Sequence, residues 1–246
     1  MRPPLHLRLA LLSLLAVAVA FPRPVAGWEV DPEAPAAQLE EFHRHFAAAA
    51  YPYPRHGASP LGLTGFDLFV EATYAPEFDD PSFAGSGGAI RGDLTGGFLS
   101  VGRIGVRKGL PGGVDLGVSY GRALGSDLDV LAGEVQWAFV KGGAATPALA
   151  LRLAGGGSEG SDAYELRQLG AELVLSKGFA VVTPFVGGGI VRSDGTFRRA
   201  AGELTVDSTQ GVVFGGLTLH LLVPRITVEV ERGETLQGVL RVGIGF

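Results

Sequence analysis

From residue 65 onward the chain alternates apolar and polar residues in segments of about ten, and this pattern constrains the fold more than any other feature. The segments that we predict to be strands are 65–74, 97–108, 113–123, 129–141, 146–155, 165–176, 179–191, 210–222, 225–232 and 236–246. Strands of soluble sheets average about 5–6 residues, whereas a tilted membrane-crossing strand needs about 9–11. The chain is therefore predicted to be all-β, a closed antiparallel up-and-down transmembrane barrel of about ten strands, with about 8–12 as the range.

The composition agrees with this class and excludes others. After residue 20 the chain has no apolar run of about 18 residues, so no membrane helix is expected. It has no cysteine, hence no disulfide framework and no lipidation site. Its net charge is −5, and without residues 1–20, which hold two arginines and no acid, it is −7. An acidic chain without basic clusters is not expected to bind nucleic acid.

The connections between the predicted strands alternate in length. Those after the second, fourth, sixth and eighth strands are short, whereas 75–96, 156–164 and 192–209, after the first, fifth and seventh, are longer and polar; the connections after the third and ninth strands are also short. The only three lysines, Lys108, Lys141 and Lys177, all close even-numbered strands. Short turns in the periplasm and longer loops outside are typical of outer-membrane barrels. This places the three lysines at the periplasmic rim and, because the strand number is even, both chain ends on the periplasmic side.

The chain before the first strand has two distinct parts. Residues 1–20 carry two arginines and then an apolar run of about 12 residues, which predicts a secretory signal peptide cleaved after Ala20 or after Gly27. Residues 28–60 read as a helix and a linker, the helix spanning about 32–50, with Asp31 as its N-cap. We expect this helix to be separable from the barrel, 61–246, and either to lie in the periplasm or to plug the lumen through Leu39, Phe42 and Phe46.

The two faces of the predicted strands differ in chemistry. One face is apolar and is expected to meet outer-membrane lipid, as with Leu116, Val118, Trp137, Leu173 and Leu219. The other face carries charges that we assign to the lumen, where they can pair or meet water: Asp67, Glu71, Arg103, Arg107, Asp115, Glu134, Arg152, Glu172, Glu229, Glu231 and Arg241. An arginine facing lipid at mid-bilayer would cost about 2–4 kcal/mol. The second strand is ambiguous, because Leu99 and Val101 share parity with Arg103.

With these features the sequence resembles the small outer-membrane β-barrel proteins of Gram-negative bacteria, over about residues 62–246. The last segment carries apolar residues at every second position and an aromatic at its end: Leu240, Val242, Ile244 and Phe246. In that class such a strand is recognised by the outer-membrane assembly machinery. The resemblance thus implies that these four residues are an assembly signal and that this machinery is a partner.

Residues with catalytic chemistry are few. His43 and His45 are two apart on the predicted helix, so a shared metal ion is not expected, and a packing or solvated face is favoured. His220, the only histidine in the barrel, is assigned to the lumen near the periplasmic end. Asp79 and Asp80 lie in the first long loop. No catalytic, metal or cofactor site is predicted.

Three hypotheses for function follow. The first is a non-enzymatic outer-membrane barrel, structural or a narrow channel, with an unknown solute. The second is a surface enzyme with its site in loops 75–96 and 192–209. The third is a soluble secreted β-sandwich, which could bury the same apolar face against a second sheet.

Overall fold

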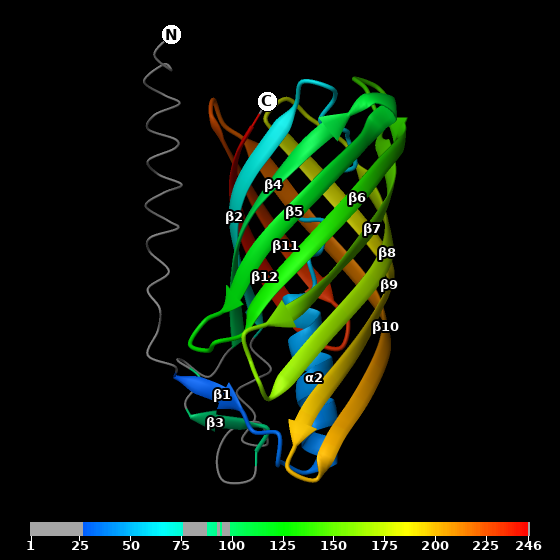
Figure 1. The fold of residues 1–246 in the computed structure, drawn as a ribbon. Helices are drawn as coiled ribbons and strands as arrows, with labels where there is room; N and C mark the ends of the chain where they lie inside the picture. The colour runs from blue at the N-terminus through cyan, green and yellow to red at the C-terminus, as the bar shows by residue number, and fades with distance from the viewer. Residues whose placement is uncertain (1–26, 76–87, 93, 95–98, 246) are drawn as a thin grey trace.

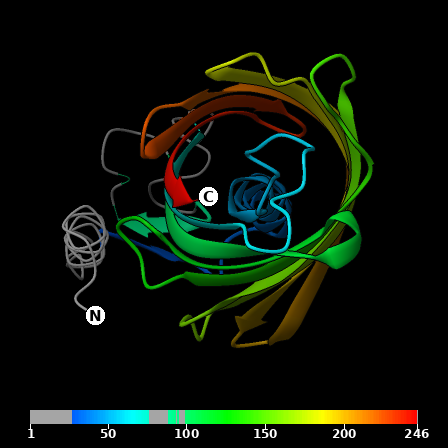
Figure 2. The ribbon, with the colours of Figure 1, turned by 90° about the horizontal axis from the view of Figure 1, so that it is seen from above.

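The computed structural model describes residues 27–75, 88–92, 94 and 99–245, and they form a closed barrel with a helix inside it (Figures 1 and 2). The ten barrel strands are antiparallel and each pairs with its neighbours in the chain, the last with the first. Their bounds are β2 Phe66–Ala75, β4 Leu99–Leu110, β5 Val114–Ala123, β6 Asp129–Lys141, β7 Ala148–Glu159, β8 Tyr164–Ser176, β9 Val182–Arg199, β10 Gly202–His220, β11 Pro224–Arg232 and β12 Leu236–Gly245. The predicted fold class and strand number are confirmed, and the soluble sandwich is excluded.

The seam between the first and last barrel strands closes the ring. β12 pairs with β2 from Gly238 opposite Tyr74 to Gly245 opposite Asp67, and with β11 on its other side. No strand edge is left along this seam, as a barrel in lipid requires. Phe246, the residue that completes the predicted assembly signal, lies outside the described residues.

The barrel has two different ends, which we name by their connections. At the turn end lie 111–113, 142–147, 177–181 and 221–223, and β2 starts and β12 ends there. At the loop end lie 124–128, 160–163, 200–201 and 233–235. Lys108, Lys141 and Lys177 all fall at the turn end, as the strand count predicts.

Two of the predicted long loops are largely strand. β7 continues to Glu159, so its connection to β8 is 160–163, and β9 and β10 continue until only 200–201 separate them. Arg198 stands opposite Glu203 in this hairpin, which extends past the other strands at the loop end (Figure 1). Residues on the two faces continue to alternate through 156–159 and through the β9–β10 hairpin, so the strand hydrogen bonds extend beyond the expected membrane-spanning part.

The outer face of the barrel is apolar. Its exposed large side chains include Leu116, Val118, Leu131, Trp137, Leu169, Leu173, Val213, Leu217, Leu219, Leu240 and Val242. These are residues assigned to lipid by their parity, and most of them are 40–65% exposed in the isolated molecule. A continuous apolar outer face of this kind marks a membrane-contacting surface rather than one solvated by water.

The helix α2 spans Ala36–Ala50, four residues shorter at its start than predicted. Its N-cap is Pro35, not Asp31, because a residue before proline is disfavoured in helical conformation and the helix begins only after Pro35. Asp31 instead accepts hydrogen bonds from the Glu33 amide at 3.0 Å and from Arg91 Nη2 at 2.7 Å. Among the described residues, no helix is both long and apolar enough to span a membrane.

Candidate functional site: a lumen filled by the N-terminal segment

The N-terminal segment, residues 27–65, runs through the barrel from one end to the other. At the loop end, β1 (Trp28–Val30) pairs with β3 (Ile90–Gly92), and Trp28 Nε1 donates to the Leu124 carbonyl at 2.9 Å. At the turn end, the Leu61 amide donates to Asp115 Oδ1 at 3.1 Å. Figure 2 shows α2 and the chain that follows it inside the ring of strands. The expectation that both chain ends lie on one side is therefore wrong for the described residues: Gly27 is at the loop end and Gly245 at the turn end.

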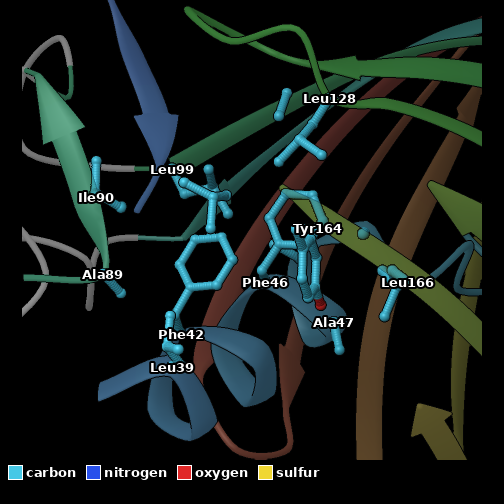
Figure 3. Packing of buried hydrophobic residues seen from close by; sticks show 14 of the residues in the cluster. Leu39, Phe42, Phe46, Ala47, Ala89, Ile90, Leu99, Leu128, Tyr164 and Leu166 are labelled. Atoms are coloured by element: carbon cyan, nitrogen blue, oxygen red, sulfur yellow. The ribbon is translucent and has the colours of Figure 1, made fainter. Parts of the chain in front are cut away.

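The loop-end half of the lumen is an apolar core. Leu39, Phe42 and Phe46 form one stripe of α2 and are fully buried. The Phe42 ring stacks on Phe46 and meets Tyr164 edge-on, each at 5.5 Å between centroids (Figure 3). It also meets Phe197 edge-on at 6.3 Å. Burial of each such side chain contributes about 1.5–3 kcal/mol.

This core resolves the ambiguity of the second predicted strand. Leu99 and Val101 point inward with Arg103, and both belong to the same buried cluster as Phe42 and Phe46. Leu99 and Val101 can point inward, like Arg103, because the loop-end half of the lumen that they face is apolar. A strand that points both apolar and charged side chains inward therefore indicates, from the sequence alone, that an apolar segment occupies part of the barrel.

His43 is the polar centre of the loop-end half. It is fully buried, with Nδ1 2.7 Å from the Tyr164 hydroxyl and Nε2 3.0 Å from Ser193 Oγ. Gly195 makes room for the ring, because a Cβ there would overlap His43 Nδ1. Both ring nitrogens are thus hydrogen-bonded inside a site shaped to the imidazole.

The end of α2 is held by the barrel wall. The last carbonyls of a helix have no partner within it. Here Arg103 Nη2 donates to the Ala50 carbonyl, and Arg152 Nη2 donates to the Pro52 carbonyl just after the helix. Gln168 Nε2 gives the Ala47 carbonyl a second donor beside the Tyr51 amide. Two arginines at the negative end of the helix dipole also stabilise it electrostatically.

Beyond the helix, Arg55 lies among three carboxylates of the barrel wall. Its Nε donates to Glu71 Oε1 at 3.2 Å, its Nη1 donates to Glu231 and lies 3.4 Å from Glu229 Oε1, and its Nη2 donates to Thr73 Oγ1 at 3.1 Å. The Arg55 side chain has no exposed surface. The N-terminal segment thus supplies a cation to a cluster of buried acids, which would otherwise lack a partner of opposite charge there.

A second ion-pair cluster joins the neighbouring strands. Arg107 lies 2.7 Å from Glu134 Oε1 through Nε and 3.1 Å from Asp115 Oδ2 through Nη2. Arg152 donates to Glu134 Oε2 at 2.8 Å and to Glu172 Oε2 at 3.2 Å. These charged side chains of the barrel wall are paired with one another rather than left to solvent.

The structure places every predicted lumen charge inside the barrel. Glu134 is partly exposed, and the other predicted lumen charges are buried. Arg241 stands opposite Glu71 across the seam, with its Nη1 3.9 Å from Glu71 Oε2, and it also donates to Asp67. The inward glycines free space that is then filled: Phe69 occupies the space at Gly105, Phe214 that at Gly187, and the Tyr51 hydroxyl that at Gly170.

Sequence reasoning missed several members of the lumen. Arg55 and Ser193 were not singled out, and the partners of His43 lie 121 and 150 residues away in the chain. The contact between Ser193 and His43 resembles part of a hydrolase dyad, but both residues are at most 2% exposed, so no substrate reaches them. Asp79 and Asp80 lie outside the described residues.

Other candidate groups have ordinary partners. His220 Nε2 lies 3.0 Å from Thr183 Oγ1 at the turn end of the lumen. His45 Nδ1 lies 2.9 Å from the Glu41 carbonyl. Within the described ranges, no group of three histidine, aspartate or glutamate side chains is arranged to hold a metal ion.

Comparison with known proteins finds similarity only to the folds of other β-barrels. No family model and no curated protein matches the chain. Among solved structures, the N-terminal β-barrel domain of Pseudomonas aeruginosa OprF is 14% identical, with 75% of this chain and 99% of that chain covered and a TM-score of 0.34. Neisserial surface protein A is 10% identical (73% and 95% covered, TM-score 0.31), and the KdgM porin is 8% identical (74% and 98% covered, TM-score 0.36). The chain is a ten-stranded barrel whose fold is similar to that of these outer-membrane barrels.

Proposed function

We propose that the protein is a non-enzymatic outer-membrane barrel whose lumen is kept closed by its own N-terminal segment. The observation that carries this proposal is the filled lumen. An apolar core occupies the loop-end half, Arg55 joins Glu71, Glu229 and Glu231 beyond it, and wall arginines bind the carbonyls of Ala50 and Pro52. A barrel whose lumen is filled in this way is a stable membrane protein without an open pore.

The membrane location rests on the outer face. Its apolar side chains would be exposed to water in a soluble protein, and in the described part of the chain the only other sheet, β1–β3, is two-stranded and lies at the loop end. A signal peptide within residues 1–27 would bring the chain to the periplasm, and the last strand would then engage the assembly machinery. Leu240 and Val242 of that strand face outward, where a receptor can read them before lipid covers them.

Conductance in planar bilayers tests the closed state. Full-length protein should show no steady conductance, whereas deletion of residues 28–58 should leave an insertable barrel that conducts. The variant Gly57→Cys with Ser176→Cys offers a lock, because a Cβ at Gly57 would lie 3.1 Å from Ser176 Cβ, near the about 3.5–4.5 Å of a disulfide. The double variant with its disulfide formed should show no steady conductance. Steady conductance of full-length or locked protein would reject the closed lumen and favour the narrow channel.

Single-cysteine labelling tests the orientation. We propose that the loop end faces outside, so that Glu29, although it precedes the barrel, is on the cell surface. The chain has no cysteine, so Glu29→Cys and Ala145→Cys give a matched pair, both exposed and at opposite ends. A membrane-impermeant maleimide should label Glu29→Cys on intact cells and Ala145→Cys only after permeabilisation. The reverse pattern would invert the proposed orientation.

The assembly role of the last residue has its own test. Phe246→Ala should sharply reduce outer-membrane assembly in cells, because the ring is proposed as part of the recognition signal. The purified variant should still refold in detergent, since loss of one ring at the last residue of the chain should remove only on the order of 1 kcal/mol. Normal assembly in cells, or equal loss in both assays, would contradict a targeting role.

A further inference from the structure

The turn end of the lumen holds a cavity that the closed state does not explain. Its volume is about 250 Å³, and it lies between the linker after α2 and the inner wall of the barrel. The side chains that matter for its chemistry are Arg55, Arg107, Arg225, Arg241, Asp67 and the threonines 183, 218 and 227. Barrel strands separate this space from lipid, so any occupant must be a solute that enters from the aqueous side.

The charges around this cavity are unequal. Four arginines line it, and among the described residues Asp67 is the only carboxylate that does. Arg55 is already held by three glutamates, and Arg107 is held by Asp115 and Glu134. The remaining two, Arg225 and Arg241, share Asp67, and Arg241 also lies 3.9 Å from Glu71 Oε2. Among the described residues, Arg225 therefore has only a share of one carboxylate, which leaves it the least neutralised arginine of the cavity wall.

Arg225 has hydrogen-bonding capacity to spare. Its Nη2 lies 3.1 Å from Asp67 Oδ1 and 3.5 Å from the Phe66 carbonyl, while its buried Nε makes no hydrogen bond to any described residue. A guanidinium presents five donors in a planar fork that matches the oxygens of a carboxylate or phosphate. The Arg225 side chain is 23% exposed, so a solute can reach it.

Hydroxyl groups lie beside these arginines on the same part of the wall, since Thr227 stands opposite Arg241 in the β11–β12 pairing. Thr218 Oγ1 and Thr227 Oγ1 lie 2.9 Å apart, and Thr183 Oγ1 lies 3.0 Å from His220 Nε2. Hydroxyls both donate and accept hydrogen bonds, so they suit a ligand that carries hydroxyls of its own. The volume is below the about 300–1,000 Å³ of pockets for drug-sized ligands, which limits the occupant to about the size of a monosaccharide.

We propose that this turn-end cavity binds a small hydroxylated solute through its single carboxylate or phosphate group. Arg225 and Arg241 hold the anionic group, and the threonine hydroxyls contact the rest of the molecule. The inference does not depend on conductance, since a solute can bind at this mouth whether or not it passes through the barrel.

Calorimetric titration of the full-length protein in a non-ionic detergent tests the site. The probes are inorganic phosphate, glucuronate, and glucose as a neutral molecule of similar size. The two anions should bind and glucose should not. Arg225→Gln should weaken binding of both anions at least tenfold, while Arg225→Lys, which keeps the charge but loses the fork, should fall in between. Arg192→Gln, an exposed arginine on β9 that pairs with Asp194, is the matched control and should bind as the parent does.

A second variant separates the two parts of the site. Thr227→Val keeps both arginines and should weaken glucuronate binding severalfold while leaving phosphate binding unchanged. The proposal is overturned if neither anion binds better than glucose, because the arginines would then serve only to close the seam at Asp67. It is equally overturned if Arg225→Gln, shown to be folded by its heat-modifiable mobility, binds both anions as tightly as the parent protein.

Discussion

The two halves of the lumen solve the same packing problem with opposite chemistry. At the loop end, aromatic and aliphatic side chains of α2 pack against the wall, and the polar exception, His43, has both ring nitrogens hydrogen-bonded. At the turn end, the linker contributes Arg55 to a wall of carboxylates and arginines. An apolar core tolerates loss of one group in proportion to the volume removed, whereas a buried ion cluster depends on each member for charge balance.

The largest effect should come from the charged half. Arg55→Met keeps much of the side-chain volume but leaves Glu71, Glu229 and Glu231 without their shared cation. Removal of one partner from a buried ion pair costs about 3–5 kcal/mol. Urea unfolding in lipid vesicles would measure this loss, with Arg44→Met, an exposed arginine of α2, as the control that should change little. If the two variants lose the same small amount, the charged half does not depend on Arg55.

The apolar half should respond less and only through volume. Leu39→Ala removes a fully buried side chain from the stripe of α2 and should reduce the free energy of unfolding by about 3 kcal/mol. Leu63→Ala, in the linker at a position that is 64% exposed, is the matched control and should have almost no effect. An unchanged stability for Leu39→Ala would show that α2 does not pack in the lumen.

The smallest expected effect concerns the fit between wall and helix. Gly195→Ala places a methyl group against His43 and should destabilise by about 2 kcal/mol, because overpacking forces a shift of the ring. Gly211→Ala on β10 meets nothing within 4 Å and should be neutral. His43→Ala should restore part of the loss in the Gly195→Ala background. Equal behaviour of the two glycines would contradict the placement of His43.

The sequence predicted the wall of this molecule well and its contents poorly. Period-two alternation settles which side chains point outward, so Leu173 and Trp137 were assigned to lipid and Arg152 and Glu172 to the lumen. The same alternation carries no information on what fills the interior. The contacts of His43 with Tyr164 and Ser193 depend on the path of the whole chain, and local patterns do not encode such distant pairings.

The main error of the sequence analysis was to place the N-terminal segment at the same end of the barrel as the C-terminus. An even number of strands does bring the start of β2 and the end of β12 to one end of the barrel, as Asp67 opposite Gly245 shows. It does not constrain residues before β2, which return through the lumen to the loop end. Strand counting treats those residues as a free tail, whereas their contacts with the wall, such as the fit of Tyr51 at Gly170 and of His43 at Gly195, show that they fill the lumen.

The path of the N-terminal segment through the barrel also bears on the order in which the parts of the protein fold. Residues 27–30 lie beyond one mouth of the barrel, while Gly65 leads into β2 at the other. With its side chains an α-helix is about 10–12 Å across, so late entry of α2 into a finished ring would require its buried aromatic residues to pass every lumen charge. We expect instead that the strands gather around α2 and that the β12–β2 seam joins last. In the full-length protein the seam would then close over an N-terminal segment that is already in place, so the barrel would enter the membrane with its lumen filled.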